Sequence, residues 1–175
     1  MTTELYWVDG PWPGRLALAA RPRGGDWLED ELGAWRRAGV ETVFSLLTRE
    51  EEDDLDLRGE RQAVKAQGMD FLSLPIGDRQ VPGSAADLAA ALKHADAKLA
   101  QGRNVVVHCR QGIGRTGLIS AALLIGRGWD AERAVRQLSA VRRVPIPDTP
   151  EQRRWIDRYA LRRQPPVWPT DDRPW

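Results

Sequence analysis

Apolar residues recur along this chain with two different periods, and the two patterns alternate. Short aliphatic or β-branched runs are typical of buried strands, whereas longer segments with an apolar residue every three or four positions are typical of helices. The pattern predicts strands at residues 15–20, 41–46, 69–74 and 104–108. It predicts an acidic loop or helix through 48–67, and helices at 26–38, 84–100, 115–127, 130–141 and 149–162.

Three predicted helices carry an N-terminal capping signature, a Ser, Thr or Asp followed three residues later by Glu or Gln. The pairs are Asp26 with Glu29, Thr48 with Glu51, and Thr149 with Gln152. Strands that alternate with helices predict an α/β fold with three layers, a mostly parallel central sheet with helices on both faces. Ligands bind such sheets at the carboxyl ends of the strands.

The most informative loop joins the strand at 104–108 to the helix at 115–127, and residues 108–117 read His-Cys-Arg-Gln-Gly-Ile-Gly-Arg-Thr-Gly. Free backbone N–H groups and the positive end of the helix dipole favour an anion there. The glycines let successive N–H groups converge, and Arg115 can hold two phosphate oxygens at once. We therefore expect a phosphate to bind Arg110, Gln111, Gly112, Ile113, Gly114 and Arg115.

The same positive field acts on Cys109 at the base of the loop and favours its nucleophilic thiolate. Thr116 directly follows the arginine, so its hydroxyl is placed to hydrogen-bond the sulfur and to help it leave in a second step. Taken alone, a single cysteine is usually a buried, inert residue, and the glycines could form an ordinary turn. The combination of Cys, five residues, Arg and Thr-Gly between a strand and a helix favours catalysis.

This loop resembles the His-Cys-X5-Arg-Ser/Thr signature of the cysteine-dependent protein tyrosine phosphatase superfamily, and its small dual-specificity branch above all. Residues 43–51 and 74–82 are similar to the corresponding segments of kinase-associated phosphatase and its bacterial relatives. The resemblance covers roughly residues 38–160. It implies a phosphoric monoester hydrolase that forms a phosphocysteine intermediate and needs neither a cofactor nor a metal.

The resemblance also implies a general acid, which in the family is an aspartate on a loop upstream of the cysteine. Asp78 lies in such a loop, among prolines and glycines. Its alternative role is that of a turn aspartate that bonds its own backbone. Asp70 is a poorer candidate because it falls within the predicted strand at 69–74. Strand alternation points His108 away from the pocket, so we expect this histidine to orient the loop rather than to act as a base.

Gln152 has two interpretations. In part of the superfamily a glutamine after the loop positions the hydrolytic water. The simpler account is that Gln152 completes the capping box of Thr149, with Pro150 at the first helical position. We favour the cap and leave Gln152 out of the predicted site.

Composition limits the remaining possibilities. A chain of 175 residues with 42% hydrophobic content predicts one domain, at 1–163, followed by a Pro/Trp-rich tail at 164–175. The net charge of +1 gives no general attraction for nucleic acid or membrane. The acidic run at 49–56 is typical of solvated surface, and the arginines after the loop are typical of a solvated helix face, although they could also line the approach to an anionic site.

One cysteine excludes an internal disulfide, and with only two histidines the chain has too few soft ligands for a metal site. The lone cysteine and the lack of a signal pattern in residues 1–11 predict a cytoplasmic protein, which we expect to be a monomer.

Three functions stay open. The first is a phosphatase for phosphorylated proteins or peptides, on phosphotyrosine and also on phosphoserine or phosphothreonine. The second acts on phosphoinositides, inositol phosphates or RNA 5′ ends; such subgroups often carry more basic residues in the loop, where Arg110 fits and the apolar Ile113 does not. The third is an inert phosphate-binding module.

Overall fold

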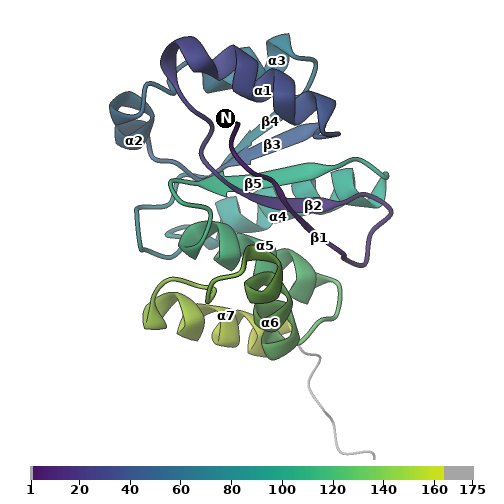
Figure 1. Ribbon diagram of the computed structural model, residues 1–175. Coiled ribbons are helices and arrows are strands. Elements are labelled where there is room, and N and C mark those ends of the chain that lie inside the picture. The colour runs from purple at the N-terminus through teal and green to yellow at the C-terminus, as the bar shows by residue number, and fades with distance from the viewer. Residues whose placement is uncertain (1, 164–175) are drawn as a thin grey trace, which may run out of the picture.

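The computed structural model describes residues 2–163, which form a five-stranded sheet covered by helices on both faces (Figure 1). The order across the sheet is β1-β2-β5-β3-β4, and only the edge pair β1–β2 is antiparallel. The predicted mostly parallel sheet is therefore confirmed. The strands are β1 (Tyr6–Val8), β2 (Leu16–Ala20), β3 (Thr42–Ser45), β4 (Asp70–Ser73) and β5 (Val105–Cys109).

Eight helical segments connect and cover the strands within residues 2–163. On one side of the sheet lie α1 and α3, and on the other lie α5, α6 and α7 (Figure 1). The segments are the 3-10 turn η1 (Gly25–Trp27), α1 (Leu28–Arg37), α2 (Arg49–Asp54), α3 (Glu60–Ala66), α4 (Ala85–Ala100), α5 (Gly114–Gly126), α6 (Ala131–Arg142) and α7 (Pro150–Arg163).

Side-chain alternation along β5 divides the core between the two faces. Val105, Val107 and Cys109 belong to the buried cluster formed with α4, α5, α6 and α7. Val106 points the other way and packs in the cluster that contains Trp35 of α1. The nucleophile candidate and His108 must therefore lie on opposite faces of the sheet.

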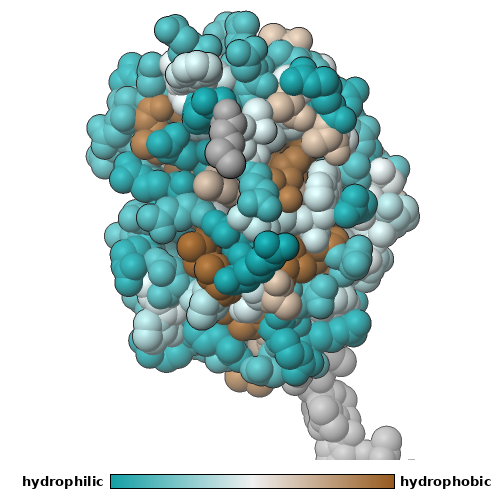
Figure 2. Space-filling view, viewed as in Figure 1, coloured by the Kyte–Doolittle hydropathy of each residue, from teal (hydrophilic) through white to brown (hydrophobic). Residues whose placement is uncertain are grey.

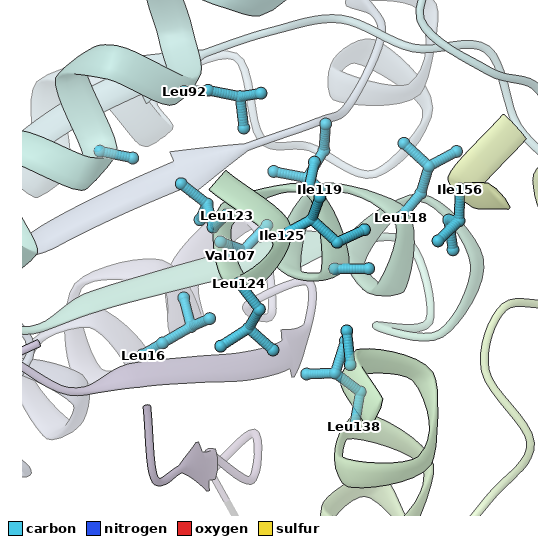
Figure 3. Close-up of a cluster of buried hydrophobic side chains, with 14 of the residues drawn as sticks. Leu16, Leu92, Val107, Leu118, Ile119, Leu123, Leu124, Ile125, Leu138 and Ile156 are labelled. Carbon is cyan, nitrogen blue, oxygen red and sulfur yellow. The ribbon is translucent and has the colours of Figure 1, made fainter. Parts of the chain in front are cut away.

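Helix α5 is the centre of the larger cluster, since all but its terminal residues are buried. Figure 3 shows Leu118, Ile119 and Leu123 of this helix among side chains from the sheet and from the other helices. A helix that is apolar all round is typical of a core position. Its N-terminus, which begins the candidate phosphate site, is thereby held in place against β5.

The structure departs from the sequence predictions in three places. The short strand β1 was not predicted, and the segment 48–67 divides into α2 and α3. The predicted cap at Asp26 is wrong: Asp26 lies inside η1, and neither η1 nor α1 has a side-chain cap bond. Gly25, at φ +60°, instead donates its N–H to the carbonyl of Asp56, which forces a turn before α1 begins.

The caps at Thr48 and Thr149 are confirmed, each with its partner three residues on. The predicted tail at 164–175 lies outside the described residues, and the domain boundary at 163 stays a prediction. Over residues 2–163, hydrophilic side chains cover most of the face seen in Figure 2, and no helix has the length and apolar character that a membrane crossing needs.

Candidate active site

The loop after β5 rests on the end of the neighbouring strand β2. Cys109 is the last residue of β5 and pairs in register with Ala20, the last residue of β2. Gly112 adopts φ +70°, and a Cβ there would collide with the backbone of Ala19. Only glycine fits both the left-handed conformation and this close approach. The loop can therefore lie directly against β2.

Gly117 is required for a different reason than the loop curvature that the sequence suggested. It lies in α5 with an ordinary helical backbone, and a Cβ there would collide with Cγ2 of Ile146. Its absent side chain lets the segment before α7 pack against the first turn of α5. This contact brings Asp148 and Gln152 to the mouth of the loop.

A pocket of about 80 Å³ opens over the loop. Cys109 lines it and is 3% exposed. The first turn of α5 faces the pocket, and the first N–H groups of a helix have no intrahelical partner, so they are available to an anion. The lining residues are Asp78, Arg79, Cys109, Arg110, Gln111, Ile113, Gly114, Arg115, Asp148 and Gln152.

Arg115 is almost completely buried and donates four hydrogen bonds to three residues. Its two terminal nitrogens donate to the Glu51 carboxylate at 2.6 and 2.8 Å. One of them also donates to the carbonyl of Ile76 at 2.8 Å, and the other to Asp78 Oδ1 at 3.0 Å. Burial opposes the charge, but the bond to Glu51 and the nearby Cys109 and Asp78 outweigh it, so the pKa of Arg115 is raised. The guanidinium is thus a permanent, pre-oriented positive charge beneath the pocket.

Glu51 is the functional residue that the sequence interpretation missed. The sequence analysis predicted that the acidic run at 49–56 is solvated. This prediction is wrong for Glu51, which is buried and pairs with Arg115. Burial raises the pKa of Glu51, but hydrogen bonds from Arg115 and from the Thr48 N–H lower it by more. The net pKa of Glu51 therefore lies below the ordinary value. No local pattern marked this role, because Glu51 already completes the capping box of Thr48; the need for an acidic partner follows from the burial of Arg115, which only the structure shows.

Asp78 reaches the pocket from the loop after β4. Its side chain is 61% exposed and accepts from Arg115. The next residue, Arg79, has φ +60° and pairs with Asp148 at 2.9 Å, so this loop is tied to the segment before α7. The structure thus brings the predicted acid to the same pocket as Cys109 and Arg115.

Gln152 forms the predicted cap and also lines the pocket. Its N–H donates to Thr149 Oγ1 and its Oε1 accepts from the Thr149 N–H, which is the predicted capping box. Its Nε2 also donates to the carbonyl of Gln80 at 3.1 Å, and the residue lines the pocket. The cap therefore places an amide beside the loop that carries Asp78.

His108 and Thr116 do not make the contacts expected of them. His108 points away from the pocket as predicted, but its Nε2 lies 2.7 Å from Glu60 Oε1, so it bonds α3 and not the loop. Thr116 Oγ1 is buried and has no hydrogen-bond partner among the described residues, so the expected bond to the cysteine sulfur is absent here. The hydroxyl lies in the buried first turn of α5, which leaves it enclosed and unpartnered.

Arg142, in the basic region after the loop, is a second residue that the sequence left unassigned. It donates to the carbonyls of Gly112 at 3.2 Å and Gln111 at 3.0 Å. These two bonds tie α6 to the loop and give hydrogen-bond donors to two of its carbonyls. Within residues 2–163 no cluster of three or more His, Cys, Asp or Glu could hold a metal ion.

Comparisons with known proteins concern the family and the fold of this chain. Residues 18–129 match the model of a family described as "Polymorphic toxin system, DSP-PTPase phosphatase". A search of curated proteins found no match.

Several solved structures share the fold. Kinase-associated phosphatase with its catalytic-site cysteine changed to serine is 18% identical, with a TM-score of 0.84 over 93% of this chain and 96% of that one. Tk-PTP in the active form is 24% identical, with a TM-score of 0.74 over 90% and 97%. PTPMT1 in complex with PI(5)P is 22% identical, with a TM-score of 0.69 over 90% and 96%.

Proposed function

Because this chain belongs to the DSP-PTPase phosphatase family of polymorphic toxin systems, we propose that its pocket hydrolyses phosphoric monoesters with Cys109 as the nucleophile, Arg115 as the phosphate anchor and Asp78 as the general acid. The membership agrees with the resemblance that residues 108–117 carry. One observation supports the residue roles above all others: Cys109 and Arg115 from one loop and Asp78 from another, more than thirty residues earlier in the chain, line one pocket at a helix N-terminus.

Binding begins with an exchange of partners at Arg115. In the free protein, a terminal guanidinium nitrogen of Arg115 donates a hydrogen bond to Asp78 Oδ1 at 3.0 Å. A phosphate dianion seated in the loop offers the guanidinium more charge than one carboxylate does, so it displaces Asp78. Glu51 keeps its two bonds to Arg115 and holds the guanidinium in place. Asp78 is then free to meet the ester oxygen of the substrate.

The reaction has two steps. In the first, the Cys109 sulfur forms a bond to phosphorus, the P–O ester bond breaks, and Asp78 gives its proton to the departing oxygen. In the second, Asp78 takes a proton from water, the water oxygen bonds phosphorus, and the P–S bond breaks to release phosphate. Loop N–H groups and Arg115 stabilise the equatorial oxygens in both steps.

For Thr116 the proposal covers only the second step, because its hydroxyl makes no bond to the Cys109 sulfur in the free protein. Its hydroxyl is buried in the first turn of α5 and has no other partner in the part of the chain described. A thiolate that reforms when phosphate leaves would be an acceptor for that hydroxyl. We expect Thr116→Val to slow intermediate breakdown more than its formation.

The substrate of this proposal is a phosphorylated protein or peptide. Phosphoinositides, inositol phosphates and RNA 5′ ends form the second candidate class; the solved complex of PTPMT1 holds PI(5)P, and Arg110 adds charge at the rim of the pocket. The cytoplasmic location and the monomeric state stay predictions. Cell fractionation tests the location, and light scattering tests the oligomeric state.

Trapping the intermediate tests the chemistry. Wild-type protein quenched during turnover should carry phosphate on Cys109, and Cys109→Ser should abolish turnover while substrate still binds. Asp78→Asn should lower kcat about 10²–10⁴-fold on phenyl-type esters and much less on activated aryl phosphates. The exposed Asp54→Asn is the matched control. Turnover without a phosphoenzyme would refute the nucleophile, and binding without turnover would identify an inert module.

A further inference from the structure

Helices α4 and α7 both pack against α5 and leave a groove between them. Two hollows, of about 370 and 390 Å³, lie along this groove and have lining residues in common, so they form one continuous depression. The shared residues are Ala89, Leu92, Tyr159 and Arg163. We call the depression the α4–α7 groove. Among the described residues, none that lines it also lines the catalytic pocket.

Small apolar and aromatic side chains form much of the groove. Ala85 and Ala89 of α4 are exposed to it, and Leu92 lies buried at its floor. On the opposite wall, Trp155 and Tyr159 of α7 stack with their ring centroids 5.1 Å apart. Grooves lined by aromatic rings are the surfaces that bind proline-rich segments in the polyproline II conformation.

Tyr159 also supplies an unused hydrogen-bonding group. The residue is only 8% exposed, and its Oη has no hydrogen-bond partner among the described residues. Buried hydroxyl groups are ordinarily paired, because leaving one unpaired costs free energy. A polyproline II segment makes no internal hydrogen bonds, so its backbone carbonyls are acceptors of the kind that this hydroxyl lacks.

The charge along the groove is positive. Lys93, Arg162 and Arg163 line it, and within residues 2–163 none of them has a carboxylate partner. Asp96, the acid in the lining, is already engaged, because it accepts from Arg127 and from the indole N–H of Trp12. A segment that fits the groove should therefore carry acidic as well as apolar residues.

The chain itself continues from this groove with such a sequence. Helix α7 ends at Arg163, which lines both hollows, and residues 164–175 read Gln-Pro-Pro-Val-Trp-Pro-Thr-Asp-Asp-Arg-Pro-Trp. At about 3.1 Å per residue, a polyproline II segment of this length spans roughly 37 Å. The 16 residues of α4 span about 24 Å, so the segment is long enough to follow the whole groove.

We propose that the α4–α7 groove binds residues 164–175 of the same chain, with Trp168 against the aromatic wall and Asp171 and Asp172 near the basic side chains. The segment is tethered at Arg163, so its effective concentration at the groove is in the millimolar range, and modest contacts are enough to hold it. This inference is independent of the proposed function, because it involves none of the residues that line the catalytic pocket.

Disulfide trapping in the full chain tests the proposal. Cys109 is the only cysteine, so in a Cys109→Ser background two introduced cysteines can pair only with each other within one molecule. Val167→Cys should cross-link to Ala89→Cys at least tenfold faster than to Ala90→Cys, the exposed neighbour that lines a hollow on the other side of α4. Non-reducing electrophoresis follows the rates. Equal rates would overturn the proposal, and so would disulfide-linked dimers, which would assign the groove to a second copy.

Competition with a labelled peptide of sequence 164–175 supplies a second measurement, read by fluorescence anisotropy. Trp168→Asp should release the chain's own segment, so this variant should bind the peptide at least tenfold more tightly than the wild type does. Adding Ala89→Arg should abolish that binding, whereas adding the control Ala90→Arg should not. Thermal unfolding checks that the variants fold. Equal binding to wild type and Trp168→Asp, or no binding to the variant, would refute the assigned occupant.

Discussion

Glu51→Gln is the substitution that tests the site most directly, because it changes one charge and almost no volume. Glu51 accepts two short hydrogen bonds from Arg115, whose side chain is 1% exposed. Glutamine keeps one acceptor oxygen and turns an amide N–H₂ toward the other guanidinium nitrogen. Asp78 and the Ile76 carbonyl then remain as acceptors for a buried charge.

The expected cost is the loss of one charge-assisted hydrogen bond in a buried pair. Such bonds contribute about 1.5–3 kcal/mol, and removing a whole partner from a buried pair costs about 3–5 kcal/mol. We expect Glu51→Gln to lower the free energy of unfolding by about 2–3 kcal/mol. At about 2–4 °C per kcal/mol for a chain of this size, Tm should fall by roughly 5–10 °C.

The pH dependence supplies a second readout. The pKa of Glu51 is lowered in the folded protein, so its contribution to stability is present above the ordinary carboxyl pKa and is lost as the pH falls through the folded value. The difference in stability between wild type and Glu51→Gln should therefore be full at neutral pH and shrink in acid.

Denaturant unfolding followed by tryptophan fluorescence over a series of pH values measures this difference. The exposed neighbour Glu50→Gln is the control and should change stability little. The variant should also bind phosphate analogues more weakly, because Arg115 is no longer held from behind. A Glu51→Gln protein with wild-type stability and an unchanged pH profile would refute the role assigned to the pair.

Three further substitutions test other parts of the site. Gly117→Ala should destabilise the fold by about 1–3 kcal/mol in thermal unfolding, because the added Cβ collides with Ile146. A Cβ at Gly126 meets nothing within 4 Å, so Gly126→Ala is the control and should be tolerated. Equal effects of the two substitutions would contradict the packing argument. Arg142→Ala should raise KM for p-nitrophenyl phosphate with little change in Tm, since it frees two loop carbonyls; an unchanged KM would argue against loop support. Gln152→Ala should lower stability by about 0.5–2 kcal/mol, because the side-chain bonds to the Thr149 N–H and to the Gln80 carbonyl are lost; a variant as stable as the wild type would disprove that role.

The sequence by itself determined the local features of this protein. The loop between a strand and a helix at 108–117, the parallel strands and the capping boxes at Thr48 and Thr149 were all predicted, and the structure confirms these elements, while phosphate binding in the loop stays a prediction. Each depends on residues a few positions apart, so hydrophobic period, glycine placement and cap spacing are sufficient. The prediction at Asp26 failed for the opposite reason, because a backbone bond from Gly25 to distant Asp56 sets where α1 begins.

Tertiary structure decided which separate segments meet at the site. Thr48 and Glu51 satisfy each other locally, so the sequence shows no need for Glu51 elsewhere. The order of the strands places α2 beside the loop after β5, and Glu51 then also pairs with Arg115, across a sequence separation of 64 residues. Local pattern specifies each element, whereas burial of charge depends on which elements pack together.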